Sequence, residues 1–251
     1  CPTNNVINAT NNWWGTTDIN AILSSIYDYV DVLSHSSMNV RKILDGPGGN
    51  PVPISYLSGL VKTETWNVVG NPYVVAANTT IYTTSTVTVN AGVEIKFNGY
   101  YSMTANGTLD VQGVAGNEVK FTYNQVSPAA GDWDRIQLST TSTLRHALVE
   151  YGNWGLYTNY TSPVIDYVTV RNNNQGIRID NTGSGTITNS TIINNGYGIY
   201  FYEAWSAYFT GSITNNSIYG NTNYNIYTQI YGCCPTNNVI NATNNWWGTT
   251  D

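Results

Sequence analysis

Charged side chains are scarce in this sequence. Only 24 of its 251 residues are Asp, Glu, Lys or Arg, which is 10%, whereas a soluble globular domain carries about 25%. The net charge is −6 and the basic residues form no cluster, which argues against a nucleic-acid partner, because such partners are bound by basic patches. No run of about 20 apolar residues is present, so the sequence indicates no membrane span.

Uncharged polar and aromatic residues take the place of the missing charge. The chain contains 35 Asn, 33 Thr, 23 Gly and 20 Tyr. Disordered chains are poor in aromatic residues and rich in charge of one sign, whereas 13% of this chain is Phe, Trp or Tyr. The composition therefore predicts a folded chain with a weakly charged, hydrated surface.

One 18-residue segment occurs twice. Residues 1–18 and 234–251 both read CPTNNVINATNNWWGTTD, which gives a period of 233 residues. Identity over the whole segment indicates a tandem array of such units. We expect residues 1–44 to close the preceding unit, residues 45–63 to be a Gly/Pro linker and the entry to the next unit, and residues 64–251 to form the parallel β-helix of that unit.

A shorter periodicity lies inside the unit. Aliphatic residues recur at spacings of 21, 22, 26 and 27 residues, at Leu144, Ile165, Ile187, Ile213 and Ile240. Five residues after the first four come Val149, Val170, Ile192 and Ile218, and Asn-rich corners lie between them. Short aliphatic strands punctuated by Asn and Gly about every two dozen residues are typical of a β-solenoid, whose coils stack to bury one continuous core.

Three segments before these coils have patterns of their own. Residues 84–97 alternate apolar and polar side chains and predict earlier coils of the same solenoid. Residues 18–33 have helical periodicity and predict a short amphipathic helix that covers the end of the preceding solenoid. The DGPGGNPVP run at 45–53 predicts a boundary after it.

The corner-and-strand pattern, and above all NATNNWWGTTD followed by IYDY at 26–29, resembles secreted right-handed parallel β-helix repeat proteins of microbial cell surfaces. These proteins share the pectate-lyase-like superfold. The resemblance implies an all-β, right-handed parallel β-helix in an extracellular, cell-surface location. It leaves the activity open, since such proteins are structural, adhesive or polysaccharide-cleaving.

Candidate catalytic and metal sites are few. Coil stacking places Arg145 beside Asp166 and Glu150 beside Arg171, which predicts ion pairs between coils and not paired acids. Asp132 and Asp134 lie two residues apart in GDWDRI, so they are candidates for a Ca²⁺ site, although a turn at the start of a strand is the favoured role. No other cofactor is indicated, and neither histidine lies in a recognisable catalytic motif.

Cysteine chemistry and glycosylation give further candidates. Cys233 and Cys234 are adjacent, and a strained vicinal disulfide and a bond to another coil or chain both stay open. Seven Asn-x-Ser/Thr sequons make the chain a candidate glycoprotein, although composition alone accounts for their number. Their asparagines are Asn8, Asn78, Asn106, Asn159, Asn189, Asn215 and Asn241.

Tyrosine and tryptophan concentrate in residues 197–231. Stacked on the outside of a solenoid, such side chains can hold sugar rings or a neighbouring filament. They are also good strand formers, which explains their presence equally well. The candidates for contact with a glycan or partner are Tyr200, Tyr202, Trp205 and Tyr227.

The sequence favours a non-catalytic structural role. We expect a repeat unit of an extracellular fibre, sheath or surface-layer-like array, whose partners are copies of itself in head-to-tail order and also cell-surface glycans. The alternative is a β-helix that binds or cleaves polysaccharide, or an adhesin.

Overall fold

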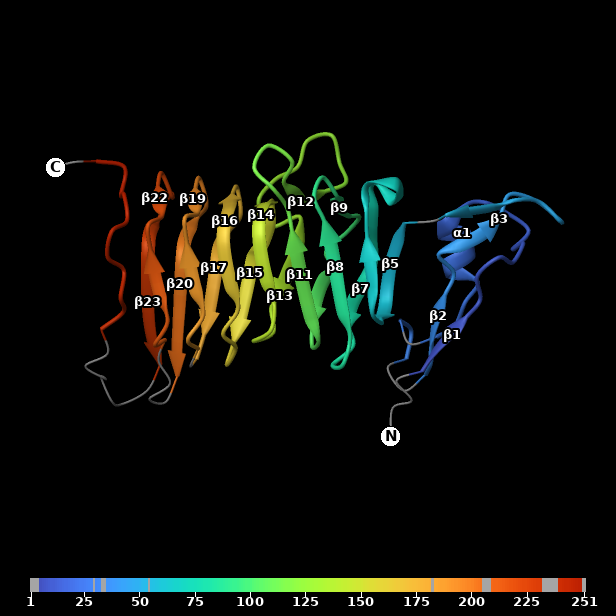
Figure 1. Cartoon of the computed structure of the whole chain (residues 1–251), viewed down its shortest axis with the longest axis horizontal. Coiled ribbons are helices and arrows are strands. Elements are labelled where there is room, and N and C mark those ends of the chain that lie inside the picture. The colour runs from blue at the N-terminus through green and yellow to red at the C-terminus, as the bar shows by residue number, and fades with distance from the viewer. Residues whose placement is uncertain are drawn as a thin grey trace.

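A computed structural model of the chain describes residues 5–28, 30–32, 35–53, 55–181, 183–204, 209–231 and 239–249. Within these ranges the protein is a right-handed parallel β-helix of about seven turns, as the sequence predicts. Figure 1 shows the β-helix as a row of coils, with a smaller group of N-terminal elements beyond one end and the C-terminal segment along the other.

The N-terminal elements precede the β-helix. They are β1 (Val6–Asn8), α1 (Ile19–Ser24), β2 (Ser37–Asn39), β3 (Lys42–Leu44) and β4 (Pro51–Pro53). β1 and β2 form a parallel pair, and β3 and β4 form an antiparallel pair.

The β-helix has three parallel stacks of strands. The first contains β6 (Glu64–Trp66), β8 (Thr86–Asn90), β11 (Thr108–Gln112), β14 (Thr143–Glu150), β16 (Val164–Arg171), β18 (Thr186–Thr188) and β21 (Ser212–Thr214). The second contains β9 (Glu94–Phe97), β12 (Val119–Tyr123), the later halves of β14 and β16, β19 (Thr191–Ile193) and β22 (Ser217–Tyr219). The third contains β5 (Tyr56–Val61), β7 (Tyr73–Ile81), β10 (Ser102–Ala105), β13 (Trp133–Gln137), β15 (Gly152–Asn159), β17 (Gln175–Asp180), β20 (Tyr197–Ala204) and β23 (Tyr224–Tyr231). The first residues of β5 and β7 extend into the second stack, where Tyr73 pairs with Ile95 of β9. A short 3₁₀ helix, η1 (Val68–Gly70), joins β6 to β7.

Columns of apolar side chains fill the core. One column runs through the first stack at Trp66, Val89, Val111, Leu144, Ile165, Ile187 and Ile213, and all seven side chains are buried. The predicted stacking from Leu144 to Ile213 is therefore confirmed. The step to Ile240 is wrong, because Ser212 bridges Asn241 and the last coil is two residues out of the predicted alignment. Ile240 still packs against the main core.

Asparagine side chains join successive corners. Asn195 Oδ1 accepts the backbone N–H of Asn173 at 3.0 Å, and Asn221 Oδ1 accepts that of Asn195 at 3.0 Å. A second ladder runs through Asn216 and Asn245, with Asn245 Oδ1 accepting the N–H of Asn216 at 2.9 Å. Buried backbone groups at the corners, which lie outside the regular strand pairing, thereby gain hydrogen-bond partners.

The start of the β-helix differs from the predicted boundary. β5 begins at Tyr56 and pairs with β7, so the β-helix already includes residues 56–61, which lie in the segment predicted to be a linker and entry. Asp45 to Asn50 form the turn that joins β3 to β4, where Asp45 Oδ1 accepts the N–H of Asn50 at 2.7 Å. The Gly/Pro run therefore makes a hairpin, because its glycines permit the tight reversal.

The predicted helix at 18–33 is shorter than expected. α1 ends at Ser24, and Ile19 and Ile22 are its buried side chains. The buried carboxylate of Asp28 accepts hydrogen bonds from the N–H groups of Val30 at 2.9 Å and Met38 at 2.7 Å. These bonds turn the chain away from the helix axis toward β2, which helical periodicity alone does not reveal.

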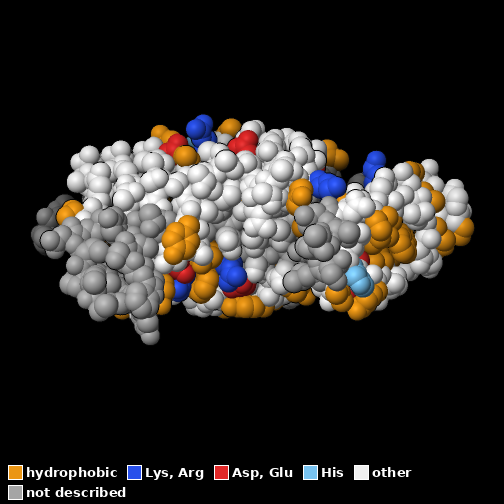
Figure 2. Space-filling view, turned by 90° about the horizontal axis from the view of Figure 1, so that it is seen from below, with side chains coloured by type: hydrophobic (Ala, Val, Ile, Leu, Met, Phe, Trp, Pro, Cys, Tyr) orange, Lys and Arg blue, Asp and Glu red, His pale blue; other side chains and the backbone are white. Residues whose placement is uncertain are grey.

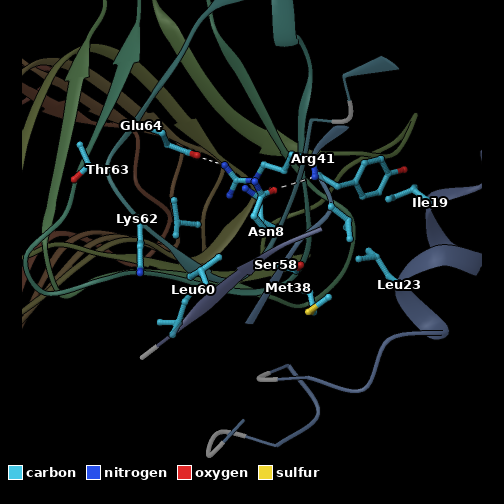
Figure 3. A pocket seen from close by; sticks show the side chains of 15 residues that line it. Asn8, Ile19, Leu23, Met38, Arg41, Ser58, Leu60, Lys62, Thr63 and Glu64 are labelled. Carbon is cyan, nitrogen blue, oxygen red and sulfur yellow. Dashed lines mark hydrogen bonds and ion pairs between the residues drawn. The ribbon is translucent and has the colours of Figure 1, made fainter. Parts of the chain in front are cut away.

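The N-terminal elements contact the first coil of the β-helix beside a cavity. Ser37 Oγ accepts the N–H of Leu60 at 3.3 Å, and Arg41 forms an ion pair with Glu64. The cavity has a volume of about 270 Å³ and is lined by residues of β1, α1, β2 and β5 and of the segment up to Glu64. Figure 3 shows the ion pair among the side chains that line it.

The surface is mostly uncharged. Figure 2 shows one face on which Lys, Arg, Asp and Glu are few and hydrophobic side chains gather at the end that carries the N-terminal elements. In the described ranges no helix has the length and apolar character needed to cross a membrane.

Candidate functional site

Outward side chains of the third stack form two rows. From β13 to β23 the strands of the third stack pair in parallel, with one register shift between Arg135 and Ile136, so that paired residues lie one above the other. The first row is Arg135, Trp154, Gln175, Tyr197 and Tyr224, and the second is Gln137, Tyr157, Arg178, Tyr200 and Tyr227. We call these two rows the aromatic–arginine face.

A column of glycines lets these coils approach closely. A Cβ atom on Gly155 would lie 2.7 Å from the carbonyl oxygen of Gly176, and one on Gly176 would lie 2.7 Å from that of Gly198. Each glycine stands directly before an inward aliphatic residue, such as Ile177 in β17. The recurring glycine–aliphatic pair in the sequence is thus a requirement for close backbone approach.

Arg178 lies at the centre of the face. Its Cζ is 4.3 Å from the ring centre of Trp154, 5.2 Å from that of Tyr200 and 5.3 Å from that of Tyr202. Its Nε donates to Asp180 Oδ1 at 2.8 Å. The guanidinium is therefore held by an ion pair and by cation–π contacts with three rings from the two neighbouring coils.

Arg135 occupies the first coil of the face. Its Cζ lies 5.1 Å from the ring centre of Trp154 and 5.4 Å from that of Tyr157, and its Nη1 is 3.0 Å from Asp134 Oδ2. Its Nε is buried and has no hydrogen-bond partner among the described residues. Trp154 is thus in cation–π contact with two arginines.

Burial changes the acidity of the tyrosines on this face. Tyr157 donates its hydroxyl to Asp180 Oδ2 at 3.2 Å. Burial, and then the negative charge of Asp180, raise the pKa of Tyr157 to about 12. Burial also raises the pKa of Tyr200, whose hydroxyl donates to Gln229. Both phenols are therefore protonated donors at neutral pH.

Four tyrosines form a cluster toward the C-terminal coils. The ring centres of Tyr200 and Tyr227 are 5.0 Å apart, those of Tyr224 and Tyr227 are 5.5 Å apart, and those of Tyr197 and Tyr200 are 5.3 Å apart. Tyr224 is exposed, whereas Tyr200 is only 9% exposed. The cluster offers ring surfaces and hydroxyl groups, which suit contact with sugar rings or with another protein chain.

The structure brings three of the four predicted aromatic candidates together. Tyr200, Tyr202 and Tyr227 lie on adjacent strands, and Trp205 lies outside the described residues. Tyr200 is buried, so its expected exposure is wrong: the rings of Tyr197 and Tyr227 and the guanidinium of Arg178 cover it.

The predicted acidic sites have structural partners. Asp132 Oδ2 accepts the N–H of Ala129 at 2.7 Å in the turn before β13, and Asp134 Oδ2 accepts the hydroxyl of Ser102 at 2.7 Å. No cluster of three or more His, Cys, Asp or Glu suited to a metal ion occurs in the part of the chain that the structure describes.

Only one of the two expected ion pairs forms. Arg171 Nε lies 2.8 Å from Glu150 Oε2. Arg145 and Asp166 are register neighbours, as predicted. The Asp166 carboxylate instead accepts hydrogen bonds from Thr188 Oγ1 and Asn189 Nδ2, each at 2.8 Å.

The sequon asparagines lie at the surface. Asn159 is half-buried and the other six are exposed: Asn8, Asn78, Asn106, Asn189, Asn215 and Asn241. Cys233 and Cys234, the predicted disulfide candidates, lie outside the described residues.

The sequence analysis missed Trp154, Tyr157, Arg135 and Arg178. They precede the tyrosine-rich segment by one to three coils. The coil spacing of 21 and 22 residues, applied to Trp154, reaches Gln175 and then Tyr197, so the same periodicity that located the core could have located this face.

Comparison of the chain with protein-family models, with curated proteins and with solved structures finds no match.

Proposed function

We propose that this chain is a non-catalytic repeat unit of an extracellular, cell-surface array, in which β-helices follow one another head to tail as a fibre or sheath. The observation that carries the proposal is the behaviour of the repeated 18-residue segment. The described parts of the two copies, residues 5–18 and 239–249, form a corner of the same geometry that packs on neighbouring strands.

The two corners agree in detail. Asn8 Oδ1 accepts hydrogen bonds from the N–H of Thr10 at 3.1 Å and its hydroxyl at 2.8 Å. Asn241 Oδ1 accepts the equivalent bonds from Thr243 at 3.4 and 3.0 Å. Asn11 and Asn244 have φ angles of 57° and 58°. A segment that forms the same corner at both positions supports a period made of whole coils, and such units can stack along one axis.

The chemistry of the acidic residues supports the non-catalytic part of the proposal. Glu150, Asp134 and Asp180 each form an ion pair with arginine. We expect no turnover of acidic or neutral polysaccharides, with or without Ca²⁺. An activity that Asp166→Asn or Asp132→Asn abolishes would refute the non-catalytic role.

The array itself is tested on native material. Electron microscopy should show thin fibres whose axial repeat corresponds to one 233-residue unit, and the flanking sequence should contain further copies. A compact closed oligomer or a strictly monomeric secreted protein would contradict the array. Head-to-tail contacts propagate, since they join two different surfaces of each unit.

The aromatic–arginine face supports a second candidate function, the binding of a polysaccharide. Rings, protonated phenols and guanidinium groups at a spacing of about 4.8 Å per coil suit a chain of sugars, acidic sugars included. Calorimetric titration with acidic and neutral oligosaccharides tests this candidate. Tyr224→Ala should weaken binding at least fivefold, whereas Tyr27→Ala, an exposed tyrosine in the N-terminal elements, should not. Absence of binding to any oligosaccharide in the panel would remove the candidate.

A further inference from the structure

We propose that the coil formed by residues 239–249 pairs through its open edge with the residues of the next repeat unit that are equivalent to 37–44, so that the β-helix continues from unit to unit without a break. This inference rests on the proposed array and names the surfaces that join its units.

In the C-terminal copy of the repeated segment, one edge of this coil is hydrogen-bonded to the preceding coil. The N–H of Ile213 donates to the carbonyl of Asn241 at 2.9 Å, and the N–H of Trp246 donates to Asn216 at 2.8 Å. Asn245 extends the asparagine ladder by donating to the carbonyl of Ile213 at 2.7 Å. Within the described residues, no strand pairs with the opposite edge of this coil.

In the N-terminal copy, the opposite edge is hydrogen-bonded to the residues that follow it. β1 pairs with β2 in parallel, with Ile7 opposite Met38. The N–H of Leu44 donates to the carbonyl of Asn12 at 3.0 Å, and the N–H of Ala9 donates to Asn39 at 2.9 Å. The partners are therefore residues 37–44, which follow the repeated segment in sequence.

Among the described residues of the two copies, the backbone groups that bond to neighbouring coils do not overlap. The C-terminal copy bonds through the carbonyl of Asn241 and both groups of Trp246, whose equivalents are Asn8 and Trp13. The N-terminal copy bonds through the carbonyls of Asn5 and Asn12 and the N–H groups of Ala9 and Asn11. One copy can thus hold both neighbours at once, as every internal strand of a parallel sheet does.

Side-chain burial is complementary in the same way. Ile7 is 47% exposed, whereas its equivalent Ile240 is half-buried against the main core. Trp247 is 38% exposed, whereas its equivalent Trp14 packs against the small core around Ile19, Ile22 and Ile43. The apolar surface that each copy exposes is therefore the surface that the other copy covers, and joining the units would bury both.

The coil spacing continues through the N-terminal elements. Ser37 contacts Leu60, and Arg41 contacts Glu64. Both pairs are 23 residues apart, and so are Trp66 and Val89, which are register partners in adjacent coils. Residues 37–44 therefore occupy the position of the coil before β5 and β6. A 233-residue unit then contributes about nine coils, and at about 4.8 Å per coil the axial repeat is about 43 Å.

A cysteine cross-link tests the pairing. The chain 19–251 lacks the N-terminal copy of the segment, so its residues 37–44 are free to accept residues 239–249 of a second molecule. With Met38→Cys and Ile240→Cys, and with Cys233 and Cys234 changed to serine, we expect covalent oligomers on a non-reducing gel. Residues opposite each other in neighbouring parallel strands lie within the Cα separation of about 4.4–6.8 Å that a disulfide needs. A peptide of residues 1–18 in excess should suppress the oligomers.

Two controls define the register. The full chain with Ile7→Cys and Met38→Cys, its native cysteines changed to serine, should form the same disulfide within one molecule. Val40→Cys in place of Met38→Cys, two residues out of register, should cross-link at least tenfold less. A folded 19–251 chain that stays monomeric and does not cross-link would overturn the proposal, and so would equal cross-linking by the two pairs.

A second design covers the case in which 19–251 does not fold. In a chain of two units, residues 1–251 followed by a second copy of 19–251, Ile240→Cys in the first unit and Met38→Cys in the second should form a disulfide. Its absence in the folded two-unit chain overturns the pairing. If fibres are seen but this disulfide is absent, the array survives and the continuous β-helix fails. If the disulfide forms but native material is not fibrous, the array fails and the pairing stands.

Discussion

Asn195 Oδ1 accepts two hydrogen bonds from Asn173, which occupies the same corner of the preceding coil: one from its backbone N–H, at 3.0 Å, and one from its Nδ2, at 2.9 Å. Asn195 Nδ2 in turn donates to the carbonyls of Val170 at 3.0 Å and Ile193 at 3.1 Å. One buried amide therefore satisfies backbone groups of two coils.

Replacing Asn195 with alanine should destabilise the protein strongly. The change leaves buried N–H and carbonyl groups without partners, and each such group costs about 1–3 kcal/mol. We expect the free energy of unfolding in urea to fall by about 2–4 kcal/mol. Asn174→Ala is the matched control, because Asn174 is exposed and its amide bonds only to Asn153. Equal effects of the two substitutions would show that the ladder does not hold the corners together.

The aliphatic column gives a second prediction. Ile187 is 3% exposed and lies between Ile165 and Ile213. Ile187→Asp would bury an unpaired charge, so we expect a loss of about 4 kcal/mol or more in the free energy of unfolding. Val164→Asp, at an exposed position of β16, should cost far less. A neutral effect of Ile187→Asp would contradict the column.

The sequence predicted the column and the corners because both are local and periodic. Aliphatic residues that recur once per coil must stack, and the Asn runs mark where the chain turns. The register of Ile240 could not be predicted in this way. The last ladder step, from Asn216 to Asn245, spans 29 residues, whereas the aliphatic spacing gives 27. An insertion in the final coil thus shifts the register, and only hydrogen bonding reveals it.

The early end of α1 and the aromatic–arginine face depend on contacts between distant residues. Asp28 turns the chain by bonding to Met38, ten residues away. Arg178 meets Trp154 and Tyr200 because successive coils align their outward side chains. A search limited to the tyrosine-rich segment therefore found only the C-terminal half of the face.

The glycine column yields a third prediction. A Cβ on Gly176 would lie 2.7 Å from the carbonyl oxygen of Gly198 and 3.0 Å from Cγ of Asn195. Gly176→Ala should therefore push adjacent coils apart and lower the free energy of unfolding by about 1–3 kcal/mol. Gly46→Ala is the control, since nothing lies within 4 Å of the added carbon there. Thermal unfolding followed by circular dichroism measures both, and an unchanged Gly176→Ala protein would show that close coil approach is not required.

The last prediction concerns alkaline pH and Tyr157. Burial and the charge of Asp180 raise the pKa of this phenol from 10.0 to about 12. Below pH 10 the phenol is protonated in both the folded and the unfolded chain, so it adds no pH dependence. Between pH 10 and 12 the folded chain keeps a proton that the unfolded chain has lost, and stability must fall as the pH rises.

The midpoint of urea unfolding should therefore drop across this interval, and Tyr157→Phe should make the drop smaller. Tyr27→Phe, at an exposed site, should leave the drop unchanged. Identical pH profiles for Tyr157→Phe and the unchanged protein would mean that the hydroxyl of Tyr157 is not held in its protonated form by the fold.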